Sequence, residues 1–300
     1  MTAHSPSSPP PSASFDPSVG VVIATRNRRD SLLVTLSHLE GLRERPPIVV
    51  VDNGSTDGTA DAVRQRQPGV RIVALPANLG AGARNVGARE LSTRYVAFAD
   101  DDSWWADGAF TEAARLFREY PRCALIAAHV LLGPEQRPDP ICAQMASSPI
   151  TSPLSLPGPP VLGFLACAAI VRRDAFLEAG GFESRLGIGG EEQLLAIDLA
   201  RRGWGLAYVH RIVAHHWPSP IRDPARRRRV QMRNGLWTAW LRRTPATAWA
   251  RTREAMRAAR DDPATRAALL EALRGLPWVL RKRERIPVTI EDGLARLERG

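Results

Sequence analysis

Three consecutive carboxylates stand at the end of an apolar run: Asp100, Asp101 and Asp102 follow residues 95–99. Carboxylates this close repel one another, and a cation among them removes the repulsion. A hard divalent ion suits such oxygen ligands and keeps coordination sites for a diphosphate, whose charge it can neutralise when a bond to the diphosphate breaks. The alternative is an acidic turn in which Asp102 or Ser103 caps the next helix. The residue types alone leave both interpretations open.

Two upstream runs of β-branched residues, 21–24 and 48–51, also break into polar turns. A segment with helical periodicity follows each run. The expected helices, each with an aspartate as N-cap, are residues 30–42 with Asp30 and residues 57–66 with Asp57. Apolar strands that alternate with helices indicate a parallel sheet covered by helices on both faces.

Polar residues end all three expected strands. They are Thr25, Asp52 and the three aspartates at 100–102. Because ligands of such sheets bind beyond the carboxyl ends of the strands, these side chains should line one crevice.

Four segments resemble, in order and spacing, the nucleotide-sugar half of family-2 inverting glycosyltransferases. The segments are VIATRNR (22–28), VVDNGSTDGT (50–59), NLGAGARNVG (78–87) and FADDD (98–102). The resemblance extends from about residue 21 to residue 216. It implies an α/β protein of the GT-A fold, in which a Rossmann-like nucleotide-sugar domain has a mostly parallel sheet with helices on both faces.

The resemblance also implies which residues bind the donor, a nucleotide-diphosphate sugar. A carboxylate at Asp52 can accept a hydrogen bond from a base N–H, and the matching aspartate of the family contacts uracil, which favours UDP- or dTDP-sugars. The alternative for Asp52 is a capped Asp-Asn-Gly turn. Gly80 permits close approach of the backbone, and the guanidinium of Arg84 suits phosphate or base. The expected nucleotide-binding residues are Thr25, Arg26, Asp52, Asn53, Gly80, Arg84, Asp100 and Asp101.

The same resemblance makes Asp100 and Asp102 the outer members of an Asp-x-Asp pair that holds Mn²⁺ or Mg²⁺ with the ribose-diphosphate. The sequence does not divide the roles among the three aspartates. In the family a histidine after a later strand, here expected over residues 206–213, can complete the metal or diphosphate site. We expect His216 rather than His215 in this role, and the alternative is a packed corner before a proline.

Glu191 and Glu192 precede a segment with helical periodicity that stops at Gly203. Two carboxylates at the start of a helix satisfy its dipole, which is one interpretation. The resemblance implies another, because family-2 enzymes carry an acidic pair, commonly Glu-Asp, whose second acid is the general base. We therefore expect Glu192 as the base and Glu191 as the alternative, although Glu at the second position is one methylene longer than Asp. Asp198 should face away and be structural.

The acceptor half offers less specific signals. An apolar run at residues 161–171 is expected to be a buried strand, and residues 173–179 a helix. The acceptor hydroxyl could belong to a lipid-linked molecule, a polysaccharide or a small molecule. The expected organisation is a disordered lead (1–18), a catalytic domain (19–220, with a nucleotide-sugar half at 19–132, a Pro- and Ser-rich loop at 133–160 and an acceptor half at 161–220) and a basic helical C-terminal region (221–300).

The net charge of +10 resides entirely in the C-terminal region. Residues 221–300 contain twenty Lys and Arg against nine Asp and Glu, so the rest of the chain is near neutral and nucleic acid is not an expected partner. Basic runs alternate there with four tryptophans, Trp237, Trp240, Trp249 and Trp278. This pattern is typical of helices that lie on an anionic membrane, whereas the alternative packs the tryptophans in a core.

Three scattered cysteines, the lack of signal-peptide features and the lack of an apolar run of about 20 residues predict a cytoplasmic protein, with peripheral attachment to the inner face of the membrane as an option. The predicted activity is metal-dependent, inverting sugar transfer to a hydroxyl group. One alternative, a nucleotidyltransferase, normally needs a Gly-rich phosphate loop that residues 25–28 lack. Another, a non-catalytic membrane-surface scaffold, fits poorly with aspartates at every motif position.

Overall fold

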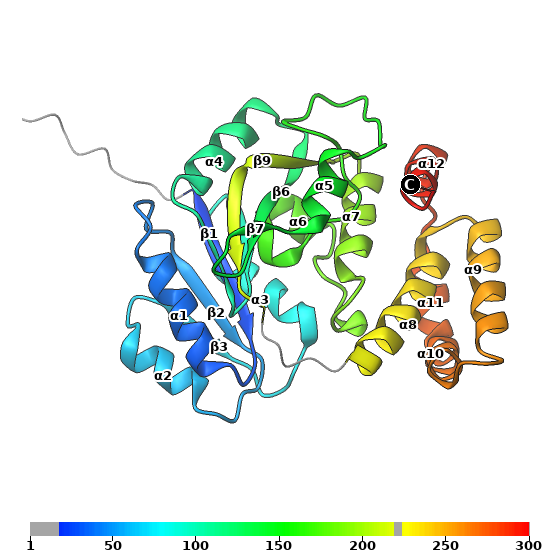
Figure 1. Ribbon diagram of the computed structural model, residues 1–300, viewed down its shortest axis with the longest axis horizontal. Helices are drawn as coiled ribbons and strands as arrows, with labels where there is room; N and C mark the ends of the chain where they lie inside the picture. The colour runs from blue at the N-terminus through cyan, green and yellow to red at the C-terminus, as the bar shows by residue number, and fades with distance from the viewer. Residues whose placement is uncertain (1–17, 219–223, 300) are drawn as a thin grey trace, which may run out of the picture.

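The computed structural model describes residues 18–218 and 224–299 (Figure 1). The expected disordered lead therefore lies outside the described residues, apart from Ser18.

The first half of the chain alternates strands and helices. In chain order these are β1 (Val19–Thr25), α1 (Arg29–Glu40), β2 (Ile48–Asp52), α2 (Thr59–Arg66), β3 (Arg71–Ala74), α3 (Ala83–Glu90) and β4 (Tyr95–Ala99). The four strands pair in parallel in the order β3-β2-β1-β4. Because the chain moves outward from β1 to β3 and then returns to the other side of β1, right-handed crossovers place α1 and α2 on one face and α3 on the other. The reversal creates a crevice between the ends of β1 and β4, where such sheets bind ligands.

The second half extends this sheet with both antiparallel and parallel pairs. Its elements are β5 (Ser103–Trp105), α4 (Ala109–Glu119), β6 (Cys123–Leu132), β7 (Arg137–Pro138), α5 (Pro140–Ala146), β8 (Ala169–Arg172), α6 (Arg173–Glu178), α7 (Glu191–Arg201) and β9 (Gly205–His216). β8 lies antiparallel between β4 and β6, β9 runs parallel to β6, and β5 pairs antiparallel with β9. The α/β prediction with the GT-A arrangement is confirmed.

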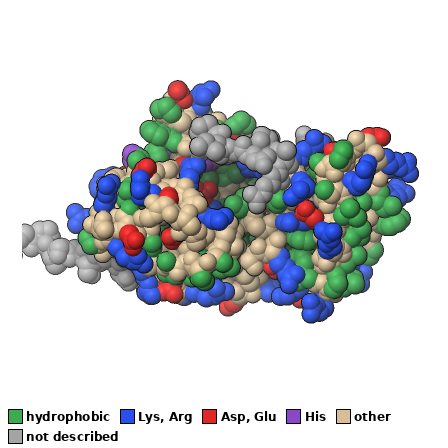
Figure 2. Space-filling view, turned by 90° about the horizontal axis from the view of Figure 1, so that it is seen from below, with side chains coloured by type: hydrophobic (Ala, Val, Ile, Leu, Met, Phe, Trp, Pro, Cys, Tyr) green, Lys and Arg blue, Asp and Glu red, His purple; other side chains and the backbone are tan. Residues whose placement is uncertain are grey.

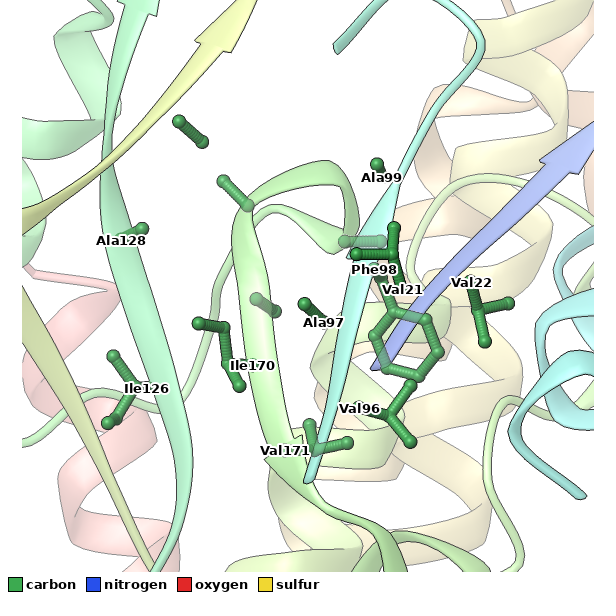
Figure 3. Close-up of a cluster of buried hydrophobic side chains, with 14 of the residues drawn as sticks. Val21, Val22, Val96, Ala97, Phe98, Ala99, Ile126, Ala128, Ile170 and Val171 are labelled. Carbon is green, nitrogen blue, oxygen red and sulfur yellow. The ribbon is translucent and has the colours of Figure 1, made fainter. Parts of the chain in front are cut away.

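The core lies around β1 and β4, whose apolar residues are buried because helices cover both faces. Val22 and Phe98 are register partners on these strands and lie beside each other (Figure 3). The Phe98 ring also contacts Phe176 and Phe182, at centroid distances of 5.2 and 5.4 Å. These contacts fix the end of β4, from which the aspartates emerge.

Both predicted N-caps are wrong. α1 begins at Arg29 with Arg28 as its N-cap residue, and Asp30 lies in the first turn, where its charge still favours the helix dipole. α2 begins at Thr59 after Gly58, whose φ is +79°. Asp57 nevertheless accepts a 3.1 Å hydrogen bond from the Thr59 amide, so it satisfies the helix start from one residue further out.

Two other local predictions are wrong. Of the expected strand at 161–171, only residues 169–171 belong to a strand, β8, because a 3₁₀ turn occupies Ala166–Ala168. A continuous apolar run indicates burial, not backbone conformation.

Ser103 begins a strand instead of capping a helix, and its hydroxyl accepts a 2.7 Å hydrogen bond from the Asp100 amide.

Five helices follow the sheet: α8 (Pro224–Arg242), α9 (Pro245–Ala258), α10 (Pro263–Arg274), α11 (Leu276–Lys282) and α12 (Val288–Leu297). We call them the C-terminal helical region, and they lie beside α7 (Figure 1). Trp237, Trp240 and Trp278 are buried in a shared core with Leu194 of α7, so the core alternative is confirmed for these three. Trp249 is 59% exposed.

Asp198 joins the two parts. Its carboxylate receives two hydrogen bonds from the buried guanidinium of Arg242, from Nε at 2.5 Å and from Nη2 at 3.0 Å. The predicted structural role of Asp198 is confirmed.

Candidate active site

The three aspartates point to three different partners. Asp101 turns toward β1, where its Oδ2 accepts a 2.8 Å hydrogen bond from the Thr25 hydroxyl and its Oδ1 lies 3.3 Å from Nε of Arg28. Its backbone carbonyl accepts hydrogen bonds from the hydroxyls of Ser31 and Thr35 at 2.8 and 3.0 Å. Burial raises the pKa of Asp101 to about 7. Asp101 thus fixes the aspartate turn against β1 and α1, and the Thr25 hydroxyl is engaged in this contact.

Asp102 faces the end of β9. Its Oδ1 lies 3.4 Å from Nε2 of His216, and its Oδ2 accepts a 3.1 Å hydrogen bond from Nη2 of Arg28. The Trp217 amide donates to the Asp102 carbonyl at 2.8 Å. His216 is placed there because it is the register partner of Ser103 in the β5–β9 pair.

The donor atoms around Asp102 fit a divalent ion. Nδ1 of His216 is buried with no hydrogen-bond partner in the described residues, and Nε2 lies next to a carboxylate oxygen. Within residues 18–218 and 224–299 no cluster of three or more His, Cys, Asp or Glu side chains is arranged to hold a metal. Mg²⁺ commonly uses only one or two protein ligands together with water and phosphate oxygens. The Asp102 carboxylate meets that requirement, and the imidazole of His216 is a nitrogen donor next to it.

Asp100 pairs with Arg84 of α3 in a short ion pair. Burial opposes the charge of Arg84, but the carboxylates of Asp100, Glu191 and Glu192 outweigh it and raise the pKa of Arg84. The guanidinium also lies 5.6 Å from the centroid of the Phe182 ring, and its buried Nε has no hydrogen-bond partner among the described residues. Arg84 therefore links the end of β4 electrostatically to the acidic pair.

The loop before α3 is held by Asn53. Its Nδ2 donates to the Gly80 carbonyl at 3.0 Å, and its Oδ1 accepts from the Leu79 amide at 2.7 Å. Gly80 has φ +57°, and a Cβ there would stand 2.7 Å from the Cα of Gly187. Only glycine fits this position. Asn53 and Gly80 thus bring the predicted nucleotide loop against the segment before α7.

Asp52 and Arg26 lie at neighbouring strand ends. Asp52 is buried at the end of β2, opposite Thr25 in register. One of its oxygens accepts a 2.9 Å hydrogen bond from the Ser55 amide, as in the Asp-Asn-Gly turn expected as the alternative. Arg26 is exposed in the turn after β1. The adjacent Asn27 ties this turn to the next by accepting from the Thr56 amide at 2.8 Å.

Glu191 and Glu192 are the first two residues of α7, and their environments differ. Glu191 is buried and accepts a short hydrogen bond from the Gly189 amide, so it turns back to its own loop. Burial and the charge of Glu192 raise the pKa of Glu191 to about 7. Burial also raises the pKa of Glu192, and Asp100 adds to this effect, whereas Arg84 opposes it. The pKa values of both acids are thus shifted upward, and perturbed pKa values of this kind cluster at functional sites.

Two residues within the quoted segments have roles that the sequence did not reveal. Arg28 bridges Asp101 and Asp102, and Asn85 joins α3 to Phe182 through hydrogen bonds of 2.8 Å in both directions. The sequence shows Arg28 three residues after Thr25, but it does not show that Arg28 contacts Asp101 and Asp102. Its importance depends on β1 lying next to β4, which no local pattern specifies.

The profile of Glycosyl transferase family 2 matches residues 20–179. The chain is 29% identical over 241 residues to the N-acetylglucosaminyl-diphospho-decaprenol L-rhamnosyltransferase of Mycobacterium tuberculosis, covering 68% of this chain and 78% of the relative.

Solved structures share the fold. The mannosyltransferase PcManGT of Pyrobaculum calidifontis, in complex with GDP-Man and Mn²⁺, has a TM-score of 0.56 at 20% identity, covering 96% of this chain and 76% of that chain. Residues 1–349 of S. aureus TarS, in complex with UDP-GlcNAc, have a TM-score of 0.57 at 15% identity, covering 78% and 69%.

The matched profile spans more than half of the chain and contains all four segments that carry the resemblance, while the acidic pair and His216 lie beyond it. The chain belongs to glycosyl transferase family 2, and it is a GT-A-fold glycosyltransferase that moves a sugar from a nucleotide-sugar donor to an acceptor.

Proposed function

We propose that this protein transfers a sugar from a UDP- or dTDP-sugar to an acceptor hydroxyl by direct displacement, with Glu192 as the general base. The observation that carries the proposal is the position of Arg84, which pairs with Asp100 and lies in the field of Glu191 and Glu192. The expected donor site and the expected base therefore face one crevice.

In this mechanism Glu192 removes the proton from the acceptor hydroxyl. The acceptor oxygen then attacks the anomeric carbon from the face opposite the nucleotide, the bond to the diphosphate breaks, and the configuration inverts because there is one displacement. The raised pKa of Glu192 supports its role, because a carboxylate with a higher pKa is a stronger proton acceptor. Glu191, which accepts a hydrogen bond from the Gly189 amide, orients the start of α7.

Asp52 accepts from an N–H of the base, and Thr25, Arg26, Asn53 and Gly80 form the surrounding nucleotide site. Arg84, Asp100 and Asp101 lie toward the ribose-diphosphate. Asp100, Asp102 and His216 would hold a Mn²⁺ or Mg²⁺ ion, which neutralises the charge that develops on the departing diphosphate. The proximity of Asp102 and His216 supports this assignment, as does the Mn²⁺ in the PcManGT complex.

The acceptor class that we favour is a lipid-linked sugar, because the mycobacterial relative is named for a diphospho-decaprenol substrate. The test is incubation with a panel of nucleotide sugars and a lipid-linked acceptor, followed by product analysis. We expect a glycosylated product of inverted anomeric configuration and free nucleoside diphosphate. Retention of configuration would exclude direct displacement. Release of inorganic pyrophosphate in a parallel incubation with a nucleoside triphosphate and a sugar 1-phosphate would indicate a nucleotidyltransferase.

A second proposal concerns an anionic membrane as partner of the C-terminal helical region. Trp249, Arg253 and Met256 recur at helical spacing, so they share one exposed face of α9. Exposed leucines continue the apolar surface on the next two helices, Leu270 and Leu273 on α10 and Leu280 on α11. Hydrophobic and basic side chains gather over this region (Figure 2). Apolar side chains among arginines complement a bilayer with negative headgroups.

Among the described residues, no helix is both long and apolar enough to cross a bilayer. The proposed attachment is therefore peripheral, on the cytoplasmic face. Flotation with phosphatidylglycerol vesicles should recover the protein, and Trp249→Ser with Leu280→Ser should reduce the recovery. Val34→Ser, which removes an exposed apolar side chain from α1, is the matched control. Equal flotation of the double variant and the control would contradict the proposal.

A further inference from the structure

The segment that leads into the acidic pair is a glycine-rich loop, residues 186–190. Gly187, Gly189 and Gly190 have φ values of +72°, +103° and +95°. Glycine adopts such conformations without strain but loses more conformational entropy than other residues when it is ordered. A loop with three such positions needs outside contacts to hold one shape. These contacts decide where Glu191 and Glu192 lie.

One side chain of the C-terminal helical region donates hydrogen bonds to both ends of this loop. Asn234 of α8 is fully buried, and its Nδ2 donates to the Leu186 carbonyl at 2.8 Å and to the Gly189 carbonyl at 2.6 Å. A Cβ on Gly190 would stand 3.4 Å from the Cβ of Asn234, so helix and loop are in close contact. The two amide hydrogens thus bind the two ends of the turn.

Arg233 fixes the orientation of that amide. Its Nε and Nη2 donate to Oδ1 of Asn234 at 3.0 and 2.9 Å, and Nη2 also donates to the Leu186 carbonyl at 3.1 Å. The guanidinium lies 4.4 Å from the centroid of the Trp237 ring. Because Oδ1 accepts from Arg233, the amide nitrogen must face the loop. If the amide of Asn234 were reversed, its oxygen would face the carbonyl oxygens of Leu186 and Gly189, which cannot donate a hydrogen bond.

The same loop contacts the donor side and the acidic pair. The Gly187 carbonyl accepts a 2.9 Å hydrogen bond from the Ala81 amide, in the loop before α3. The Gly189 amide donates to Glu191. Residues 186–190 therefore join three parts of the molecule: the nucleotide loop, the start of α7, and α8.

We propose that Asn234 is a positioning residue for the transfer reaction, and that α8 thereby takes part in building the active site. The amide of Asn234 holds residues 186–190 so that the acidic pair faces the crevice and the Gly189 amide points at Glu191. This inference rests on the proposed function of the acidic pair.

The test compares Asn234→Ala with Thr238→Val as a matched control. Thr238 lies one turn further along α8 and is buried, and its hydroxyl has no hydrogen-bond partner among the described residues, so its loss should change neither turnover nor loop exchange. In Asn234→Ala we expect turnover to fall by about 10²-fold, the effect of a small misplacement of a catalytic group, with the donor KM nearly unchanged.

The pH profile provides a readout that general destabilisation would not move. The charged groups that face the acidic pair are Arg84 from α3, Asp100 from the end of β4 and the two acids themselves; Arg233 is the nearby cation of α8. Asn234→Ala leaves all of them in place but loosens the amide that stabilises ionised Glu191. Less ionised Glu191 repels the carboxylate of Glu192 less, so the acid limb of the turnover profile, which reports Glu192 as the base, should move to lower pH.

Arg233→Lys keeps the charge and removes the fork that orients the amide, so it should give a smaller change in the same direction. If Asn234→Ala does not fold, Arg233→Lys serves as the test of the positioning role. Hydrogen exchange of residues 186–192 gives a readout that does not depend on activity. We expect faster exchange in the Asn234 or Arg233 variant than in Thr238→Val. Unchanged exchange, or unchanged turnover and pH profile in a folded variant, would overturn the inference, whereas full activity of Glu192→Gln would overturn only the proposed base.

Discussion

Nε2 of His216 lies 3.4 Å from Oδ1 of Asp102, although the two residues come from opposite halves of the catalytic sheet. The contact exists because β5, which follows the aspartates directly, pairs antiparallel with the last strand β9. A carboxylate oxygen and an imidazole nitrogen are thereby presented together at the mouth of the β1–β4 crevice.

This contact leads to a prediction about the metal. Asp102→Asn and His216→Ala should each lower turnover by about 10²-fold or more, because the charge of the leaving diphosphate would be poorly compensated. EDTA should abolish activity, and added Mn²⁺ or Mg²⁺ should restore it. Asp107→Asn, at an acid paired with Arg43 outside the crevice, is the control and should keep both activity and EDTA sensitivity. Full turnover in excess EDTA would rule out the metal.

Asp52 should contribute to nucleotide affinity. Asp52→Ala is expected to weaken binding of UDP and dTDP by about 1–3 kcal/mol, because an N–H of the base would lose its acceptor. Asp52→Asn is the sharper variant, since its amide oxygen can still accept from the Ser55 amide and preserve the turn. Titration calorimetry measures the affinity, and circular dichroism confirms the fold. Unchanged affinity in both variants would remove Asp52 from the nucleotide site.

The general base can be separated from its neighbour by two isosteric changes. Glu192→Gln should depress turnover by about 10²- to 10⁴-fold with donor affinity retained, because glutamine cannot take the proton. Glu191→Gln retains an acceptor for the Gly189 amide and should cost less. Steady-state kinetics and donor binding measure both. Activity in Glu192→Gln with none in Glu191→Gln would exchange the two roles, and activity in both would exclude the acidic pair as base.

The acidic pair also makes stability depend on pH. The pKa of Glu191 is raised from 4.5 to about 7, so the folded protein binds a proton more tightly than the unfolded chain. Its contribution to the free energy of unfolding is therefore complete below about pH 4.5 and is lost as pH rises through about 7. Turnover should also rise with pH as Glu192 loses its proton, because the base must be ionised. Melting temperatures at pH 5 and pH 8 should differ more for the wild type than for Glu191→Gln, and equal differences would contradict the shift.

The strand ends were predictable because each is a local pattern, a β-branched run broken by a polar turn. The division of labour among Asp100, Asp101 and Asp102 was not, because it depends on Thr25 and Arg84, which the sheet order and α3 bring to them. The aspartates lie in the turn after β4 and point to three different partners, so the neighbouring elements decide which carboxylate meets which partner.

The sequence also did not show which backbone conformation an apolar segment adopts, or which apolar side chain on a helix is buried. Residues 161–168 are as apolar as a strand but adopt an irregular path that ends in a 3₁₀ turn. In the C-terminal helical region, helical spacing showed that Trp237 and Trp249 lie on helices. Which tryptophan is covered depends on the packing of α8 against α7, and that contact is set by residues far apart in the chain.

The ion pair between Asp198 and Arg242 has a thermodynamic consequence. Both charges are buried, and each would be left without its partner if α8 separated from α7. Removing one partner typically costs about 3–5 kcal/mol, because the other charge stays buried without compensation. Separation of α8 would also uncover Leu194, and loss of the segment after α11 would uncover Ile197. We therefore expect the C-terminal helical region and the catalytic sheet to melt as one cooperative unit, and a chain that stops near residue 220 would lack part of its own core.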